Sequence, residues 1–373
     1  MRVQVNRDEQ GATALLLVFM TIMFLGFAAI AVDAGYGFVS KRNLQNAADA
    51  GALSAADYLV SESGSCAQVA ADTDAVDEAQ AIAEQFSEDN RSAKIETGFE
   101  VRCSDDNRRI EVWYRNGGTT STVFAPMIGE GSATAAEREA VASVGVPGSL
   151  TGLRPYFVCI TDADALRASS GWLRVGFPNA SCGNQPGNWY TVDCPEDGQG
   201  NGTPVIAVNT REGCASEVSV VDLTSAGGDP VLEKQLLLAA CTGSPPLSAE
   251  NGCLTGNTGN LSSNPLKLAW DTLLGQTITL PVFELDTVVG TGNNARYPIR
   301  AIMGAKVCGY KWNSKDNIST DPECAGVSIP GGNQNFLWLK YDSYQTTGTS
   351  KPSTCAVGDP NCDYGLRNVS LDE

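Results

Sequence analysis

Cysteine is the residue type in this sequence whose number most directly indicates chemistry. The chain carries 12 cysteines among 373 residues. No two of them are spaced as C-x-x-C, the pattern typical of thiolate zinc sites, so disulfide bonds are a better expectation than metal ligands. Disulfides persist in oxidising compartments, and the cysteine content therefore predicts that most of the chain lies outside the cytoplasm.

The cysteines are expected to form six disulfides, mostly between neighbours in the sequence. The preferred pairs are Cys66 with Cys103, Cys159 with Cys214, Cys182 with Cys194, Cys241 with Cys253, Cys308 with Cys324, and Cys355 with Cys362. Spacing alone does not determine connectivity, so other pairings stay open. Each bond would close a loop with little core beneath it and contribute about 2 to 4 kcal/mol.

The absence of histidine removes much of the usual catalytic chemistry. Without histidine there is no Ser-His-Asp triad, Cys-His pair, HExxH zinc site or imidazole general base. The sequence also lacks a G-x-x-x-x-G-K-[ST] phosphate loop, a G-x-S-x-G elbow and an S-x-x-K pair. Two carboxylates could still hydrolyse a glycosidic bond, but no two acids stand out, so we expect no enzyme, cofactor or catalytic residue.

The acidic residues favour solvation over metal or polyanion binding. Asp72, Asp74, Asp77 and Glu78 lie close together but lack the glycine and terminal glutamate of an EF-hand loop, so no metal site is predicted. The formal net charge of −18 argues against nucleic acid and anionic lipid as partners, since basic patches bind both.

Tryptophans supply the remaining candidate contacts. Five lie in the outer half of the chain: Trp172, Trp189, Trp270, Trp312 and Trp338. Exposed aromatic side chains could bind a host glycan, a cell-wall polymer or another subunit, whereas buried ones would form the core. Core is the commoner role, and no tryptophan is assigned to a ligand.

An apolar run near the N-terminus is the segment expected to anchor the rest of the chain. Residues 12–32, ATALLLVFMTIMFLGFAAIAV, carry no charge and match the roughly 20 residues that cross a bilayer as a helix. A cleaved signal peptide is the alternative, because Ala29 and Ala31 form an A-x-A pattern, but the run exceeds the usual h-region. All cysteines follow the run, which predicts a cytoplasmic leader over residues 1–11 and a single-pass protein with its bulk outside.

Beyond the run, an alanine-rich stretch is predicted to continue the helix, with a break at Gly35 or Gly37. Small residues recur there every four positions, which permits close approach by another helix. Asp33 marks the membrane exit or, alternatively, pairs with a partner's cation. The residues expected to pack against helices of similar subunits are Asp33, Leu44, Ala47, Ala48, Gly51, Ala52 and Ala55.

The same stretch resembles the N-terminal segment of Flp (Tad) pilus-assembly proteins of the TadE/TadG type. That family's pattern is a glycine, an apolar span, A-V-D-x-G, a polar turn and L-Q-N-A-A-D-A-x-A-L. The matching residues are Gly11, Ala31, Val32, Asp33, Gly35, Leu44, Gln45, Asn46, Ala47, Ala48, Asp49, Ala50 and Leu53. Cleaved pseudopilins of this system carry a glutamate five residues after the glycine. Here that position is Leu16, so the resemblance is closest to uncleaved TadG-like members, without their D-x-S-x-S metal motif.

The remaining pattern predicts an α+β fold. Residues 33–146 should hold the juxtamembrane helix and a small pilin-like unit. That unit has a helix over 67–90, with an apolar stripe from Val69 to Phe86, and strands within 94–103, 108–115 and 131–146. A glycine-containing linker at 145–152 leads into a β-rich, disulfide-stapled domain over 147–373. The strands expected in that domain are YFVCI, TPVIAVN, VSVVDL, QTITLPVFELDTVV, YPIRAIMGAKVCGYKW and NFLWLKY, with a hairpin around GTGNNARY.

These features predict a membrane-anchored, non-catalytic accessory or minor component of a bacterial Tad/Flp-type pilus-assembly machine. Its N-terminus would be cytoplasmic, and its partners would be other pilus-assembly or pilin-like membrane subunits, with no nucleic acid. Two alternatives stay open. One is a displayed adhesin with a cell-surface or glycan ligand, and the other is a carboxylate-dependent envelope hydrolase.

Overall fold

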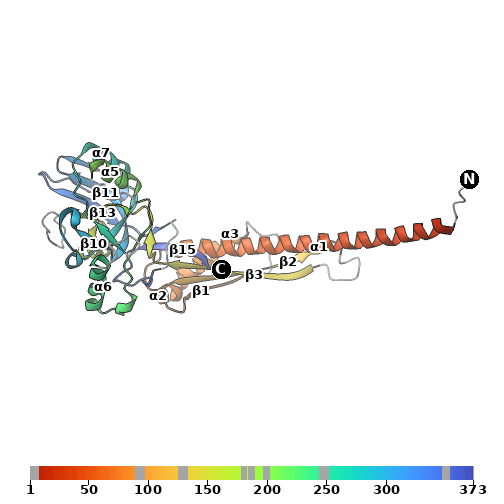
Figure 1. The fold of residues 1–373 in the computed structure, drawn as a ribbon. Coiled ribbons are helices and arrows are strands. Elements are labelled where there is room, and N and C mark those ends of the chain that lie inside the picture. Colours follow the sequence, from red (N-terminus) through yellow and green to blue (C-terminus); the bar gives the residue numbers. More distant parts are fainter. Residues whose placement is uncertain are drawn as a thin grey trace, which may run out of the picture.

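A single long helix sets the shape of the molecule. In the computed structural model, which describes residues 8–88, 97–124, 133–177, 183, 190–195, 202–242, 252–346 and 353–372, α1 runs without interruption from Asp8 to Leu59 (Figure 1). Its 52 residues extend about 78 Å at roughly 1.5 Å per residue. The expected break at Gly35 or Gly37 is absent, and neither glycine has a non-local heavy atom within 4 Å of its Cβ position.

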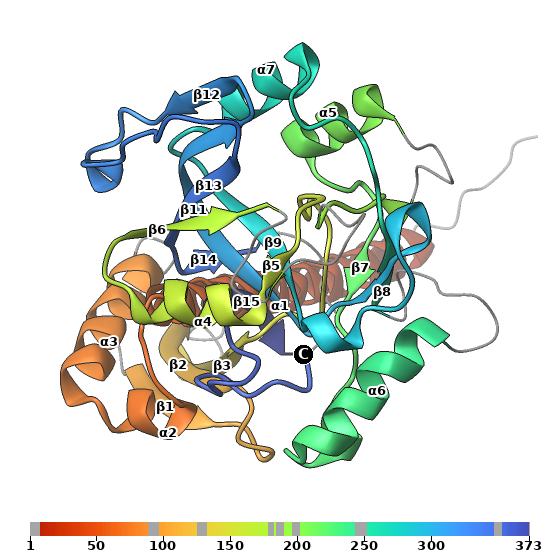
Figure 2. The same ribbon diagram turned by 90° about the vertical axis from the view of Figure 1, so that its left-hand side faces the viewer.

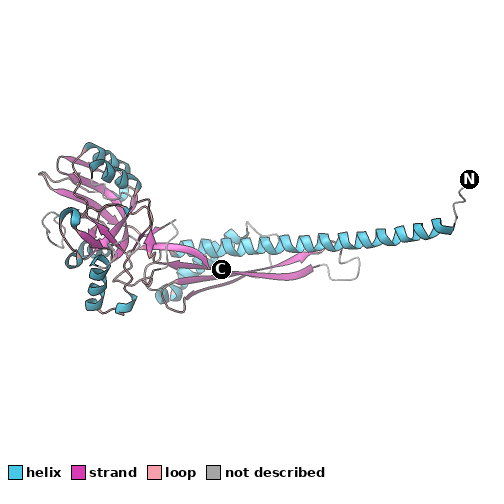
Figure 3. Cartoon of the chain, in the orientation of Figure 1, coloured by secondary structure: helices cyan, strands magenta, loops and turns pink. Residues whose placement is uncertain are grey.

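The first half of α1 stands free of the rest of the described chain (Figure 3). Its large apolar side chains from Leu15 to Ile30 are between 54% and 72% exposed. The helix is long and apolar enough to cross a membrane, and its most apolar stretch is not buried by the rest of the described chain. An apolar surface of this extent needs a non-aqueous environment, which the expected bilayer would provide.

The second half of α1 is covered by a small α+β unit, here called the stalk unit. It contains α2 (Cys66–Ala71), α3 (Thr73–Glu88), β1 (Thr97–Cys103), β2 (Ile110–Ser121) and β3 (Ala133–Gly145). The strands pair antiparallel in the order β1-β2-β3, and α1 packs on β2, β3 and α3.

The helix expected over residues 67–90 is divided at Asp72. This residue has extended backbone angles, and its Oδ1 accepts hydrogen bonds from the amides of Asp74 and Ala75, which caps the start of α3. The expected apolar stripe is only partly right, because Val69 and Ala79 are buried whereas Phe86 is 51% exposed. The buried side chains of α3 are all small: Ala75, Ala79, Ala83 and Ser87.

The C-terminal strand returns to the stalk unit. β15 (Leu366–Asp372) pairs antiparallel with β3, and the two-residue β14 (Tyr344–Gln345) pairs parallel with β15. The full order is β1-β2-β3-β15-β14. The predicted division at residue 146 is therefore incomplete, because the outer domain is inserted between β3 and β15.

The outer domain is built around a second, mostly antiparallel sheet (Figure 2). Its strands are β5 (Val158–Cys159), β6 (Trp172–Gly176), β9 (Thr277–Phe283), β11 (Ala301–Trp312), β12 (Lys315–Ile318) and β13 (Asn335–Tyr341). The order is β5-β9-β11-β13-β6, with β12 beside β11. Two small sheets pair β4 (Ser149–Leu150) with β7 (Val218–Ser219) and β8 (Cys253–Thr255) with β10 (Arg296–Pro298).

Helices surround this sheet: α4 (Ile160–Ala168), α5 (Thr203–Glu212), α6 (Pro230–Thr242) and α7 (Asn264–Leu273). Short 3-10 turns lie at Thr224–Ala226, Leu285–Thr287, Gly292–Asn294 and Pro322–Cys324. One prediction fails here. TPVIAVN forms α5 rather than a strand, since Pro204 opens the helix and Gly213 ends it. The expected hairpin around GTGNNARY is present, because β9 and β11 pair antiparallel and Val289 bridges antiparallel to Arg296.

The tryptophans mostly form the core. Trp270, Trp312 and Trp338 are at most 1% exposed, which removes them as surface ligands. Trp172 is partly buried and donates its indole N–H to the carbonyl of Ala325. Trp189 lies outside the described residues.

Most of the expected disulfides are present. The structure forms Cys66–Cys103, Cys241–Cys253, Cys308–Cys324 and Cys355–Cys362. It also joins Cys194 to Cys214, so the predicted Cys182–Cys194 and Cys159–Cys214 pairs are wrong. Cys159 is disulfide-bonded, and Cys182 lies outside the described residues. The Cys194–Cys214 bond holds the end of α5 against residues 190–194, a contact that chain spacing does not reveal.

Candidate anchoring and assembly site

The small-residue face of α1 is covered by the chain itself. Ala47, Ala48, Ala52 and Ala55 have no exposed surface. They lie where α1 packs on α3 and on the sheet, and the buried residues that α3 presents are alanines and a serine. Small side chains on both helices let the two backbones approach closely. This face therefore contacts the chain's own α3 and sheet, and its packing against helices of other subunits stays a prediction.

Gly51 shows how tight this packing is. A Cβ atom at residue 51 would lie 2.6 Å and 2.7 Å from two ring carbons of Tyr114 and 3.1 Å from the carbonyl oxygen of Ala83. Tyr114 is fully buried on β2. The glycine is thus required by the close approach of a neighbouring ring rather than by its backbone conformation.

Leu44 closes the membrane-proximal end of the same core. It is 4% exposed, and its side chain lies over Gly118 of β2, where a Cβ atom would be only 2.8 Å from a Leu44 methyl carbon. Towards the N-terminus the large side chains of α1 become exposed, including Tyr36, Phe38 and Val39. Leu44 therefore marks the boundary between the covered and the bare parts of α1.

Asp33 makes a contact far along the chain. Its Oδ1 accepts hydrogen bonds from the backbone N–H of Val123 at 2.7 Å and of Phe124 at 3.1 Å, and its Oδ2 accepts from Phe124 at 3.1 Å. These amides follow the end of β2, so the carboxylate ties this connection to α1 near the predicted membrane exit. A charge-assisted bond of this kind is stronger than one between neutral groups.

At the opposite end of the stalk unit, residues 353–365 join it to the outer domain. This segment, the C-terminal clamp, contains the Cys355–Cys362 disulfide. The amide of Val357 donates to the carbonyl of Arg108 at 2.9 Å, which connects the clamp to the turn between β1 and β2. Arg167 of α4 donates to the clamp carbonyls of Pro360 at 2.7 Å and Asp363 at 3.1 Å. The clamp thus contacts both units.

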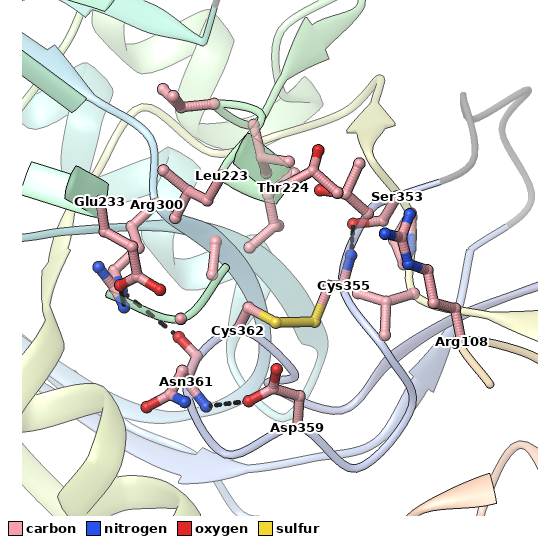
Figure 4. A pocket seen from close by; sticks show the side chains of 18 of the residues that line it. Arg108, Leu223, Thr224, Glu233, Arg300, Ser353, Cys355, Asp359, Asn361 and Cys362 are labelled. Carbon is pink, nitrogen blue, oxygen red and sulfur yellow. Dashed lines mark hydrogen bonds and ion pairs between the residues drawn. A yellow bond between two sulfur atoms is a disulfide. The ribbon is translucent and has the colours of Figure 1, made fainter. Parts of the chain in front are cut away.

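A cavity of about 210 Å³ opens beside the clamp, between the two units (Figure 4). The Cys355–Cys362 disulfide lies along it, with Arg108 on one side and Glu233 and Arg300 on the other. Arg300 is buried, and each of its three guanidinium nitrogens donates a hydrogen bond. It donates to Glu233 at 2.6 Å, to Glu284 at 3.4 Å and to the carbonyl of Asn361 at 3.4 Å. Burial raises the pKa of the Glu284 carboxyl, and Arg300 opposes this shift.

The chemistry available at these places is structural. In the described part of the chain, no group of three or more Cys, Asp or Glu side chains is arranged to hold a metal ion. Glu233, which lines the cavity, and Glu284 are ion-paired to Arg300, and these pairs join α6 to the segment after β9 within the outer domain. The clamp was missed by sequence reasoning, although the close Cys355–Cys362 pair indicated a stapled loop.

The comparison with protein families agrees with the geometry of α1. Residues 11–57 match the Tad family model, which describes Flp pilus-assembly TadE/G-like proteins. No curated protein and no solved structure matches the chain. The matched range covers the apolar half of α1, Asp33 and nearly all of the buried small-residue face. The N-terminal segment of this chain is therefore similar to TadE/G-like proteins of Flp pilus assembly.

Proposed function

We propose that this protein is a membrane-anchored, non-catalytic accessory or minor component of a Tad/Flp-type pilus-assembly machine. In this proposal it acts as a rigid stalk that holds an outer interaction domain at a fixed distance from the membrane. The observation that carries the proposal is the continuity of α1, whose bare apolar half leads directly into a half covered by the stalk unit. From Asp33 to Leu59 the helix rises about 39 Å at roughly 1.5 Å per residue.

The Asp33 contact supports a fixed rather than a swinging stalk. A helix that leaves a bilayer alone can bend or rotate at the exit. Here the carboxylate holds residues 123 and 124 against that position. The sheet is therefore tied to α1 at both of its ends, by Asp33 and by the packing of Ala55 and Leu59. The N-terminus would be cytoplasmic and the disulfide-braced part outside.

The partners in this proposal are other pilus-assembly or pilin-like membrane subunits. Because the small-residue face is covered by the chain's own α3 and sheet, the surface left for such subunits is the bare apolar half of α1. Helices in a bilayer associate through van der Waals packing of their surfaces. Side chains such as Phe19, Phe24 and Phe27 are more than 60% exposed there.

Deletion of the gene in a cell that assembles Flp-type pili tests the proposal. We expect reduced piliation by electron microscopy and recovery with the full chain. We also expect Asp33→Ala to restore piliation less well than the matched control Asp57→Ala, since Asp57 is an exposed carboxylate on the same helix. Normal piliation in the deletion strain, with the remaining assembly proteins at normal levels, would contradict the proposal.

A further inference from the structure

A second cavity, of about 340 Å³, lies in the outer domain beside the edge of the stalk sheet. It is lined by the segment that follows β4, by the first residues of β9, by the end of α5 and by β14. The polar side chains on its wall are those of Thr151, Arg154, Glu212, Thr277, Thr279, Tyr344 and Thr346. One cation therefore faces a group of hydroxyls, with a single carboxylate at the rim.

The guanidinium of Arg154 is unpaired among the residues that the structure describes. Its backbone amide donates to the carbonyl of Thr279 at 2.9 Å, which fixes the residue in place. Its Nε and Nη1 atoms are buried without a hydrogen bond to any described residue. Burial lowers the pKa of this guanidinium. Arg154 therefore differs from Arg300 and Arg367, whose buried guanidinium groups are paired with acids.

The carboxylate of Glu212 attracts this charge but forms no ion pair with it in the described part of the chain. Glu212 accepts from Nη2 of Arg211 at 2.6 Å, and both of those side chains are more than half exposed. The hydroxyls of Thr277 and Thr279 are directed to Asp342 and to the carbonyl of Gly152, respectively. A partly buried cation whose neighbours are committed elsewhere is unfavourable unless an anion completes it.

We propose that this cavity is an oxyanion-binding site in which Arg154 supplies the charge. The ligand class is a phosphate, sulfate or carboxylate group, because a guanidinium N–H forms charge-assisted hydrogen bonds with the oxygens of these groups. Nε and Nη1 of Arg154 are enclosed by the protein, so Nη2 is the nitrogen that would donate to the ligand. The cavity is large enough for such a group together with a small attached moiety. The group could be a free ion or part of a larger molecule, and the probes below distinguish a phosphate- or sulfate-type group from a carboxylate.

The test uses the full chain in detergent micelles. Thermal unfolding and calorimetric titration are measured with inorganic phosphate, sulfate, acetate and glucuronate, each against sodium chloride of equal ionic strength. We expect saturable binding of at least one probe at millimolar concentration. Binding of phosphate or sulfate alone indicates an inorganic or esterified phosphate-type group. Binding of acetate or glucuronate indicates the carboxylate of a peptide or an acidic sugar.

Two variants separate binding from folding. Arg154→Met should weaken binding at least tenfold and should be no less stable than wild type without the probe, because an unpaired charge has been removed. The matched control Arg211→Met, which changes an exposed arginine near the same rim, should bind as wild type does. The proposal is overturned if no probe binds saturably, or if Arg154→Met and wild type bind equally. These outcomes do not depend on piliation, so they leave the proposed function untouched.

Discussion

The stalk unit and the outer domain build their cores from different kinds of side chains, small ones in the stalk unit and aromatic ones in the outer domain. The stalk core is dominated by alanines on α1 and α3, and the ring fully buried among its described residues is Tyr114, against Gly51. The outer domain packs rings against one another. Trp270 lies 4.9 Å from Tyr156 and 5.7 Å from Trp312, measured between ring centroids.

This difference reflects the shape that each unit must adopt. Small side chains let two helices run close together over a long distance, which gives a thin and straight stalk. Large rings fill the space between a sheet and its surrounding helices, which gives a thick domain that disulfides brace at its loops. Different substitutions should therefore destabilise the two cores. Larger side chains should destabilise the stalk unit, and smaller ones should destabilise the outer domain.

The largest expected effect is the loss of a ring from the outer core. Trp270→Ala should reduce the free energy of unfolding of that domain by about 3 to 5 kcal/mol, the usual range for a buried aromatic. Denaturant titration followed by near-ultraviolet circular dichroism measures this loss. Leu268→Ala, on the same helix but 66% exposed, is the matched control and should change little. Equal effects of the two variants would contradict the aromatic core.

Loss of the clamp disulfide should have the second largest effect on stability. Replacing Cys355 and Cys362 together with alanine should cost about 2 to 3 kcal/mol, as expected for a short closed loop. Hydrogen exchange should rise in residues 353–365, because the joint between the two units loosens. The Cys308→Ala/Cys324→Ala pair, which lies within the outer domain, should leave the joint protected. Unchanged exchange in the clamp variant would show that the bond does not hold the joint.

Added volume in the stalk should have the next largest effect. Gly51→Leu should destabilise the stalk unit by about 1 to 3 kcal/mol, because a side chain there meets the Tyr114 ring. Gly35→Leu is the matched control, since no non-local atom lies within 4 Å of a Cβ at that position. Trypsin sensitivity of the stalk in detergent micelles distinguishes them. Similar digestion of both variants would mean that the small-residue face is not closely packed.

The smallest expected effect depends on pH. Burial would raise the pKa of Asp271, but hydrogen bonds from Asn317, Lys267 and Tyr310 outweigh it and hold the pKa below the usual value. The carboxylate therefore contributes stability above its unfolded pKa of about 3.9, and this contribution is lost as pH falls through the lower folded pKa. Asp271→Asn should lower stability at neutral pH by less than about 1 kcal/mol, and the difference from wild type should shrink below pH 4. A constant difference across this range would contradict the assignment.

The sequence predicted the elements whose evidence is local. Each of these patterns lies within a single helix or strand: the apolar run, the small residues every four positions and the alternation in β1 and β2. It could not predict what covers that element. The repeat at Ala47, Gly51 and Ala55 lies on the face of α1 that packs on α3 and the sheet of the same chain, and the buried residues of α3 are equally small.

Long-range pairings were also beyond reach. The match of Asn368 with Gly145 across β15 and β3 joins residues separated by the entire outer domain, and no local pattern encodes it. α5 was misread because its valines and isoleucine favour strands, whereas packing against α7 decides the outcome. Arg154 has nothing in its flanking sequence that distinguishes it, because its isolation arises only when α5, β9 and β14 enclose it.

Hydrogen exchange of the full chain in lipid nanodiscs tests the central claim most directly. If the stalk unit covers its own helix, the amides of residues 44–59 will be strongly protected in the isolated protein and will not change when other pilus-assembly membrane subunits are added. Fast exchange of these residues in the isolated protein, with protection only after such subunits are added, would contradict the account. It would restore the view that the small-residue face is completed by another chain.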